Sequence, residues 1–183
     1  MTDAAQARYS TGAMLFHWLI AILVIVNWRI AEGAEHLEGA EKLAAIAPHK
    51  AIGVTIFVLT ILRLLWRISH KAPPMPDSMA KWERVLAKTV HIVFYVMLLT
   101  LPIGGWLASS YAHLPVDYFG LFNVPLLSVE QNYDTAISIV GQHKTGGKVV
   151  LALVVLHVLG ALKHTFIDKV GGLKRMWPGG STA

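Results

Sequence analysis

The segment HKTGGKVVLALVVLHVLGALKH, residues 143–164, is apolar enough to lie in a lipid bilayer, yet it contains three histidines. His143 and His157 are fourteen residues apart, and His164 follows seven residues later. In an α-helix, fourteen residues make about four turns and rise about 21 Å. His143 and His157 are therefore expected on one helix face, near opposite surfaces of a membrane.

The whole chain has the composition of a membrane protein. Hydrophobic residues fill 55% of its 183 positions, and the mean hydropathy is +0.53. Four segments are long enough to cross an apolar core about 30 Å thick: residues 13–32, 49–68, 87–108 and 143–166. We predict an all-α fold, an integral membrane four-helix bundle that forms one domain over residues 1–183. The first segment is longer than the apolar part of a signal peptide and contains a histidine, so we expect it to be a retained span.

The basic charge follows the membrane topology. The net charge is +5, and with a cytoplasmic N-terminus eleven of the sixteen Lys and Arg residues fall on the inner side. Cytoplasmic loops carry an excess of Lys and Arg. The pattern predicts that both termini are cytoplasmic, and it gives no support to nucleic-acid binding.

The connections between the spans carry local signals. The first outer connection, residues 33–48, has room for a short surface helix, and Pro48 suits the first turn of the second span. In the third span, Pro102 and the glycines that follow it predict a kink or fraying near the outer end. The second outer loop, residues 111–134, is aromatic and apolar, and we expect it to pack over the top of the bundle.

Histidines are the main candidates for function, because the chain has no cysteine for a disulfide, an iron–sulfur cluster or a thioether-linked haem. Ionisable residues inside membrane spans are costly and are usually functional. An imidazole that is hydrogen-bonded across helices is the structural alternative for each one alone. The candidates lie inside the spans, at their ends or, for the last, where the fourth span leaves the membrane: His17, His49, His91, His143, His157 and His164.

Depth in the membrane sorts these histidines into pairs. His49 falls at the outer level with His143, and His17 falls at the inner level with His157. Zinc normally takes three or four protein ligands, and no Cys, Asp or Glu stands near these positions. Haem iron needs only two axial ligands, because the porphyrin supplies the other four. The pairs therefore indicate two haem sites.

His91 also lies at the inner level and is an alternative to His17. A porphyrin lies against the helix that presents its ligand, so the next turn should carry a small residue. Four residues after the paired histidines stand Ala21, Gly53, Gly147 and Ala161, whereas Tyr95 follows His91. This comparison favours His17.

Several stretches resemble the bacterial cytochrome b561 family, whose members are four-helix membrane proteins with two b-type haems. The matching stretches are LFHWLIAILV, PHKAIGVTIFVLTILRLLWR, HIVFYVMLLTLPIGGW and HKTGGKVVLALVVLHVLGALKH, one from each span. The resemblance implies that His17 and His157 hold the inner haem iron and that His49 and His143 hold the outer one. Chain and loop lengths are most similar to members called superoxide oxidases, which pass electrons from external superoxide to ubiquinone.

The inner end has candidates for a quinone site. His91 and His164, with Lys81, Trp82 and Arg67, could border a pocket for a ubiquinone headgroup, which needs hydrogen-bond donors beside an apolar entry. Lys81, Trp82 and Arg67 are alternatively ordinary anchors at the membrane interface. His91 and His164 could instead contact a haem propionate.

The outer end has cations beside the proposed ligands. Lys50 and Lys144 directly follow His49 and His143, and Lys148 stands one turn beyond Lys144. Their charge would raise the local concentration of an anion such as superoxide, although solvated lysines at a helix end are also common. Acidic residues of the first outer loop oppose a broad anion funnel: Glu32, Glu35, Glu38 and Glu41.

Three classes of function follow. The first is an oxidoreductase of the bacterial inner membrane, with two haem b groups, superoxide as donor and ubiquinone as acceptor, and with lipid but no obligatory protein partner around it. The second is a cytochrome b subunit of a larger dehydrogenase or hydrogenase. The third is a metal transporter, which would be colourless; the absence of Asp and Glu from the interior of the spans speaks against it.

Overall fold

A computed structural model describes residues 8–177, so both ends of the predicted 1–183 domain extend beyond the described residues. Four long helices dominate it: α1 (Thr11–Gly33), α2 (Gly39–Ser69), α3 (Lys81–Tyr111) and α4 (Tyr133–Leu162). All four are long and apolar enough to cross a membrane. The predicted all-α four-helix bundle is confirmed.

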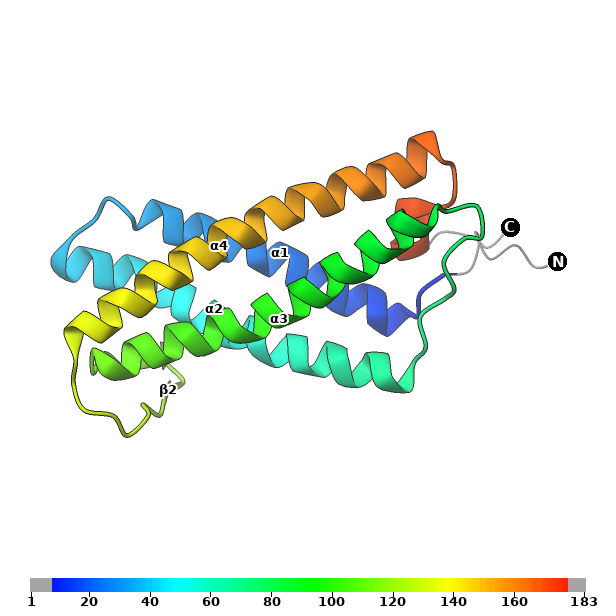
Figure 1. Cartoon of the computed structure of the whole chain (residues 1–183). Helices are drawn as coiled ribbons and strands as arrows, with labels where there is room; N and C mark the ends of the chain where they lie inside the picture. The colour runs from blue at the N-terminus through cyan, green and yellow to red at the C-terminus, as the bar shows by residue number, and fades with distance from the viewer. Residues whose placement is uncertain (1–7, 178–183) are drawn as a thin grey trace.

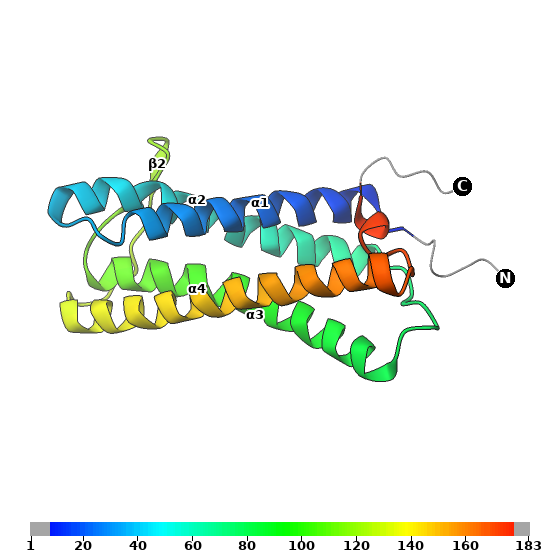
Figure 2. The same cartoon turned by 90° about the horizontal axis from the view of Figure 1, so that it is seen from above.

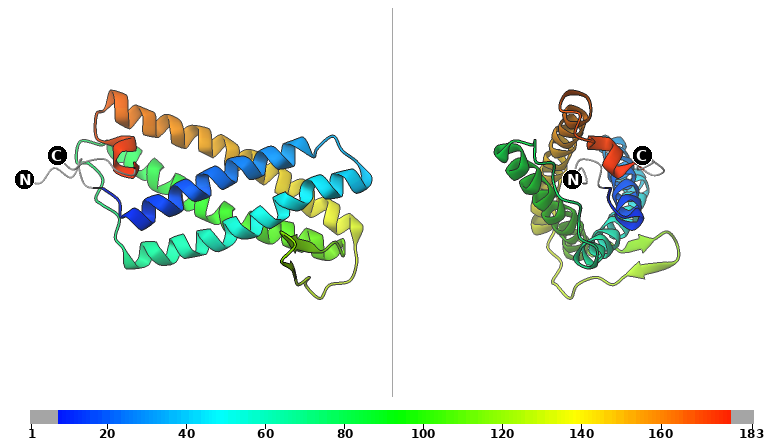
Figure 3. Two further views of the ribbon diagram at one scale, coloured as in Figure 1. Left: turned by 180° about the vertical axis from the view of Figure 1, so that it is seen from behind. Right: turned by 90° about the vertical axis from the view of Figure 1, so that its right-hand side faces the viewer.

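Consecutive helices run in opposite directions, so the two ends of the described chain lie at the same end of the bundle (Figure 1). We call this the terminal end, and we call the opposite end the hairpin end. α1 packs on α2, α2 on α3 and α3 on α4. Seen from above and along the bundle, the helices surround a common axis in chain order (Figures 2 and 3). The contact between α1 and α4 is sparse, which leaves that side of the bundle loosely packed.

α2 differs from the sequence-based expectation at its start. Residues 39–48 form its first turns, so the predicted surface helix is not separate and Pro48 lies inside α2. Proline removes a single backbone donor, and the segment before it, residues 43–47, is rich in alanine, the strongest helix former. α2 is therefore continuous from the first connection into the apolar span.

α3 is also longer than the predicted span. It contains Pro102 and continues to Tyr111 without fraying at the glycines that follow the proline. Ser110 stabilises this end of α3 through two hydrogen bonds. Its Oγ donates to the Trp106 carbonyl, one turn earlier, at 2.9 Å and accepts from the Leu127 amide of the following loop at 3.1 Å. The loop after α3 is therefore tied to the helix end.

The second long connection contains a small antiparallel hairpin, β1 (Val116–Tyr118) and β2 (Phe122–Val124). The hairpin lies beside the bundle rather than over its end (Figure 3), so the expected packing of this loop was wrong. Val116 is buried, and the Tyr118 hydroxyl lies 3.1 Å from Thr55 Oγ1 of α2. These contacts hold the hairpin against the side of α2.

The chain after α4 folds back over the terminal end. The π-helix η1 (Lys163–Ile167) continues α4, and a 3₁₀ turn, η2 (Gly172–Met176), follows. Trp18 Nε1 of α1 donates to the Met176 carbonyl at 2.7 Å, and the Leu173 amide donates to Thr165 Oγ1 at 2.9 Å. This segment therefore links α4 to α1 across the loosely packed side.

Candidate functional site

Two predicted ligands meet at the hairpin end. The rings of His49 from α2 and His143 from α4 have centres 5.8 Å apart. Two imidazoles that share one metal at about 2.0–2.1 Å per bond have ring centres about 6 Å apart. The structure therefore brings these histidines to a separation that suits one metal between them.

Hydrogen bonds fix the tautomer of both rings. His49 Nδ1 lies 3.1 Å from the Asn27 carbonyl, and His143 Nδ1 lies 3.0 Å from the Leu101 carbonyl. A carbonyl only accepts, so both Nδ1 atoms carry the proton and both Nε2 atoms keep a free lone pair. Metal-bound histidines usually donate their second nitrogen in this way. The donor set therefore fits an iron with two neutral nitrogen ligands.

Glycines leave space beside this pair. A Cβ added to Gly147 would meet nothing within 4 Å, and one added to Gly53 would meet only Asn27 Nδ2, at 3.9 Å. Each glycine stands four residues after one of the two histidines. The space where a flat macrocycle would lie against α2 and α4 is therefore not filled by side chains of these positions.

Three histidines meet at the terminal end. The ring centre of His157 lies 6.0 Å from that of His17 and 5.5 Å from that of His91, with the same interplanar angle of 67°. Ring geometry alone therefore does not choose between His17 and His91 as the partner of His157.

A cavity of about 1020 Å³ opens beside these three rings. Ligand pockets in proteins are typically about 300–1,000 Å³ and mainly apolar. Its walls come mostly from α1, α3 and α4, with apolar side chains such as Ile20, Val24, Phe94, Leu98 and Val154. The cavity lies on the loosely packed side of the bundle and has the size and lining that a macrocycle requires.

Arg63 also borders this cavity, and sequence reasoning counted it only toward topology. One guanidinium nitrogen lies 3.3 Å from His17 Nδ1, and the guanidinium lies 5.6 Å from the centre of the Tyr95 ring. A usable signal was present, because Arg63 follows His49 by fourteen residues, the spacing that separates His143 from His157. The same rule of four turns places Arg63 at the level of the second histidine group.

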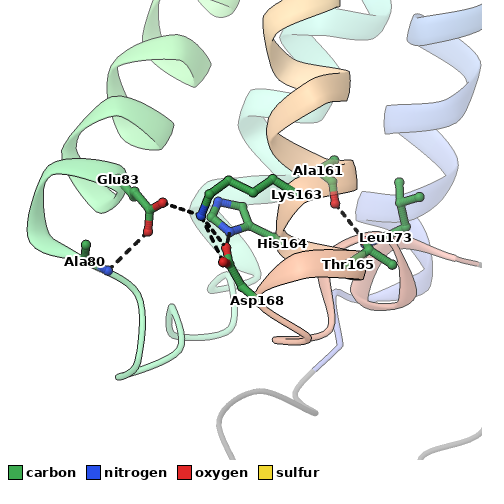
Figure 4. A network of polar contacts seen from close by, with 8 residues as sticks. All are labelled: Ala80, Glu83, Ala161, Lys163, His164, Thr165, Asp168 and Leu173. Atoms are coloured by element: carbon green, nitrogen blue, oxygen red, sulfur yellow. Dashed lines mark hydrogen bonds and ion pairs between the residues drawn. The ribbon is translucent and has the colours of Figure 1, made fainter.

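Polar groups cluster where η1 begins (Figure 4). Lys163 Nζ lies 2.7 Å from Glu83 Oε1 and 2.7 Å from Asp168 Oδ2, and His164 Nδ1 lies 2.6 Å from Asp168 Oδ2. The hydrogen bond from Lys163, followed by that from His164, holds the pKa of Asp168 below its ordinary value. Glu83 and Lys163 link α3 to the end of α4.

Glu83, His164 and Asp168 present ligand atoms within 4.8 Å of one another, which is close enough for a metal ion. The Lys163 ammonium already bonds to both carboxylates, so a cation is present between them. This cluster is better explained as an ion-pair network than as a metal site. His164, a predicted quinone or propionate contact, belongs to this network and also borders the large cavity.

The other predicted residues of the terminal end do not border one common cavity. Trp82 borders the large cavity but is 64% exposed. Arg67 lies on a second, small cavity of about 30 Å³ that His91 and Arg63 also border. Lys81 is exposed at the start of α3. Exposure suits the alternative in which Lys81 and Trp82 are interface anchors.

The predicted cations of the hairpin end differ in their environment. Lys144 Nζ lies 2.6 Å from Glu35 Oε1, and this hydrogen bond lowers the pKa of Glu35. The charge of Lys144 is thereby balanced. Lys148 is exposed, and Lys50 is half-buried next to His49.

A membrane-spanning four-helix bundle with histidine pairs at two levels defines a class, the membrane cytochromes b. The chain matches the family model of prokaryotic cytochrome b561 over residues 8–179, and it belongs to that family. It is therefore a multi-pass membrane protein that binds b-type haem and transfers electrons. The resemblance predicted from the four spans is confirmed.

Three relatives match over nearly the whole chain. Cytochrome b561 homolog 2 of Escherichia coli K12 is 34% identical over 173 residues, covering 92% of this chain and 90% of the relative. Cytochrome b561 homolog 1 of the same strain is 26% identical, with 93% and 97% covered. A protein of Yersinia pestis called probable superoxide oxidase CybB is 28% identical over 172 residues, with 93% and 96% covered.

Proposed function

We propose that the chain is a superoxide:ubiquinone oxidoreductase that carries electrons across the bacterial inner membrane through two b haems. One observation carries this proposal: a pair of histidine rings at each end of the bundle, with centres 5.8 Å and 6.0 Å apart. The similarity to a relative named as a probable superoxide oxidase supports the choice of donor.

His49 and His143 would hold the iron at the hairpin end, and His17 and His157 would hold the iron at the terminal end. Bound haem b supplies reversible one-electron chemistry at its iron. α4 provides one ligand to each site, and the fourteen residues between them set the two levels about 21 Å apart along the helix. In this proposal one helix would set both the ligation and the spacing of the two sites.

The distribution of Lys and Arg supports an orientation. The terminal end carries most of these residues, which favours the cytoplasmic side for both termini. The hairpin end then faces the periplasm, and superoxide would arrive there. Lys50 and Lys148 provide positive charge near His49 and His143, whereas Glu35 balances Lys144.

The terminal end has features of a ubiquinone site. The cavity beside His157 reaches His164 and Lys163 through apolar walls, and a quinone could enter through them from the lipid. Two superoxide anions and one ubiquinone, with two cytoplasmic protons, give two dioxygen molecules and one ubiquinol. The His164–Asp168 pair, linked through Lys163 to Glu83, provides proton-carrying groups next to this cavity.

The test uses purified, oxidised protein, an enzymatic superoxide source and ubiquinone, with haem absorbance and ubiquinol followed together. We expect rapid haem reduction that superoxide dismutase abolishes, reoxidation by ubiquinone, and one ubiquinol for every two superoxide anions. Haem that remains oxidised in superoxide would contradict the proposal. If a catalytic subunit then co-purified and reduced the haem, the chain would be the electron-carrying subunit of a larger enzyme.

A further inference from the structure

Arg63 is a cation within a membrane span, and no carboxylate lies within ion-pair distance of it among residues 8–177. The ion pairs of this part of the chain use the carboxylates of Glu35, Glu83 and Asp168 instead. A charged group in an apolar environment is costly unless it is paired. An anion that binds in the cavity would provide the missing partner.

The two side chains described in contact with Arg63 are neutral. The guanidinium lies over the Tyr95 ring, 5.6 Å from its centre, and one of its nitrogens lies 3.3 Å from His17 Nδ1. A guanidinium has no acceptor, so it must donate to a lone pair on His17 Nδ1. This leaves the proton of the neutral His17 ring on Nε2.

That tautomer conflicts with iron binding through Nε2. When Nε2 of His17 binds a metal, the ring proton must move to Nδ1, and Nδ1 can then no longer accept a hydrogen bond from Arg63. Haem binding at His17 would therefore release the guanidinium next to the cavity. The ligand that displaces it carries two carboxylates of its own, the haem propionates.

We propose that Arg63 binds a propionate of the b haem held by His17 and His157, so that the chain has a carboxylate-binding site on α2. This inference rests on the proposed haem assignment. Two other cations on the cavity wall already have partners: Lys163 bonds to Glu83 and Asp168, and Arg175 donates to the Pro74 carbonyl. Lys88 of α3 is an exposed cation that does not border the cavity, so it provides a control.

A positive charge beside a propionate favours the reduced haem, because reduction adds negative charge to the site. We expect Arg63→Gln to make reduction of one haem about tenfold less favourable, a fall of about 59 mV for a one-electron couple. The second haem, near His49 and His143, should keep its potential. Lys88→Gln should leave both potentials unchanged.

Potentiometric titration of the purified wild type and of both variants gives the first result. The second comes from protein reconstituted with the iron porphyrin in which both propionates are methyl esters. If Arg63 binds a propionate, replacing haem b by the ester should weaken porphyrin binding about tenfold more in the wild type than in Arg63→Gln, because only the wild type loses the contact. Equal losses of affinity in the two proteins would overturn the proposal, and so would unchanged potentials with haem b.

Arg63→Lys covers the case in which Arg63→Gln does not retain haem. It keeps the charge, so we expect it to restore haem binding and most of the potential; failure to do either would count against the charge-based role. A wild type without haem would contradict the haem assignment itself. If two haems are bound and neither potential changes in Arg63→Gln, only the propionate site would be overturned.

Discussion

The tautomers of three membrane histidines follow from what their Nδ1 atoms contact. His49 and His143 face backbone carbonyls, which hold the proton on Nδ1 and leave Nε2 for a metal. His17 faces the Arg63 guanidinium, which holds the opposite tautomer. The two levels of the bundle thus differ: the hairpin-end pair is ready to bind a metal, and the terminal-end group must rearrange.

Removing one ligand of the hairpin-end pair tests the first assignment. We expect His49→Ala and His143→Ala each to lose one haem of two and to keep the other, because the second site lies about 21 Å away along α4. The measurement is haem per protein, with a potentiometric titration of what remains. His36→Ala, in the exposed connection at the same end, should retain full haem content. Full occupancy in either ligand variant would remove that histidine from the site.

The choice between His17 and His91 needs a direct comparison. We expect His17→Ala to lose the terminal-end haem and His91→Ala to retain it, since Tyr95 leaves less room beside His91 than Ala21 leaves beside His17. Haem content and the electron paramagnetic resonance signal of the oxidised protein report on ligation. The reverse result, with haem lost only in His91→Ala, would exchange the two roles.

Sequence patterns could place these histidines because helix geometry converts spacing into depth and face. The same rule could have found Arg63, fourteen residues after His49, but a lone cation was attributed to topology. The tautomers could not be predicted. They depend on the carbonyls of Asn27 and Leu101, which belong to other helices.

At the scale of elements, apolar periodicity located the spans but not their ends. α2 begins at Gly39, because alanine-rich residues continue the helix through Pro48. The π-helix η1 begins where Lys163 bonds to Glu83 of the distant helix α3 and to Asp168, five residues further on. Local sequence gives no signal for such a turn. The position of the hairpin beside α2 likewise depends on the distant contact between Tyr118 and Thr55.

The docking of η2 on η1 depends on a glycine. A Cβ on Gly172 would lie 2.8 Å from both the Ala161 carbonyl oxygen and the Thr165 amide nitrogen, so backbone must move. We expect Gly172→Ala to destabilise the protein by about 1–3 kcal/mol, the usual cost of overpacking. Thermal unfolding measures this effect.

A second glycine provides the control. Gly141 lies in α4 with nothing within 4 Å of an added Cβ, so Gly141→Ala should be neutral or stabilising by up to about 1 kcal/mol. Equal melting temperatures for Gly172→Ala and the wild type would show that η2 is not held in place by close backbone packing.

At the scale of the molecule, the bundle closes through three helix pairs and leaves the fourth side, between α1 and α4, loosely packed. The large cavity lies there, and the C-terminal segment crosses it at the terminal end through Trp18 and Met176. The sequence pattern predicts four spans and two histidine levels. It does not predict which side of the bundle is open, because that follows from packing among all four helices.

The central claim is that one chain holds two b haems, one at each end of the bundle. The most direct measurement is the ratio of haem b to protein in the purified, detergent-solubilised chain, from the pyridine haemochrome spectrum and quantitative amino-acid analysis. The proposed function predicts two haems per chain. A ratio of one in fully loaded protein, or a colourless protein, would contradict the account.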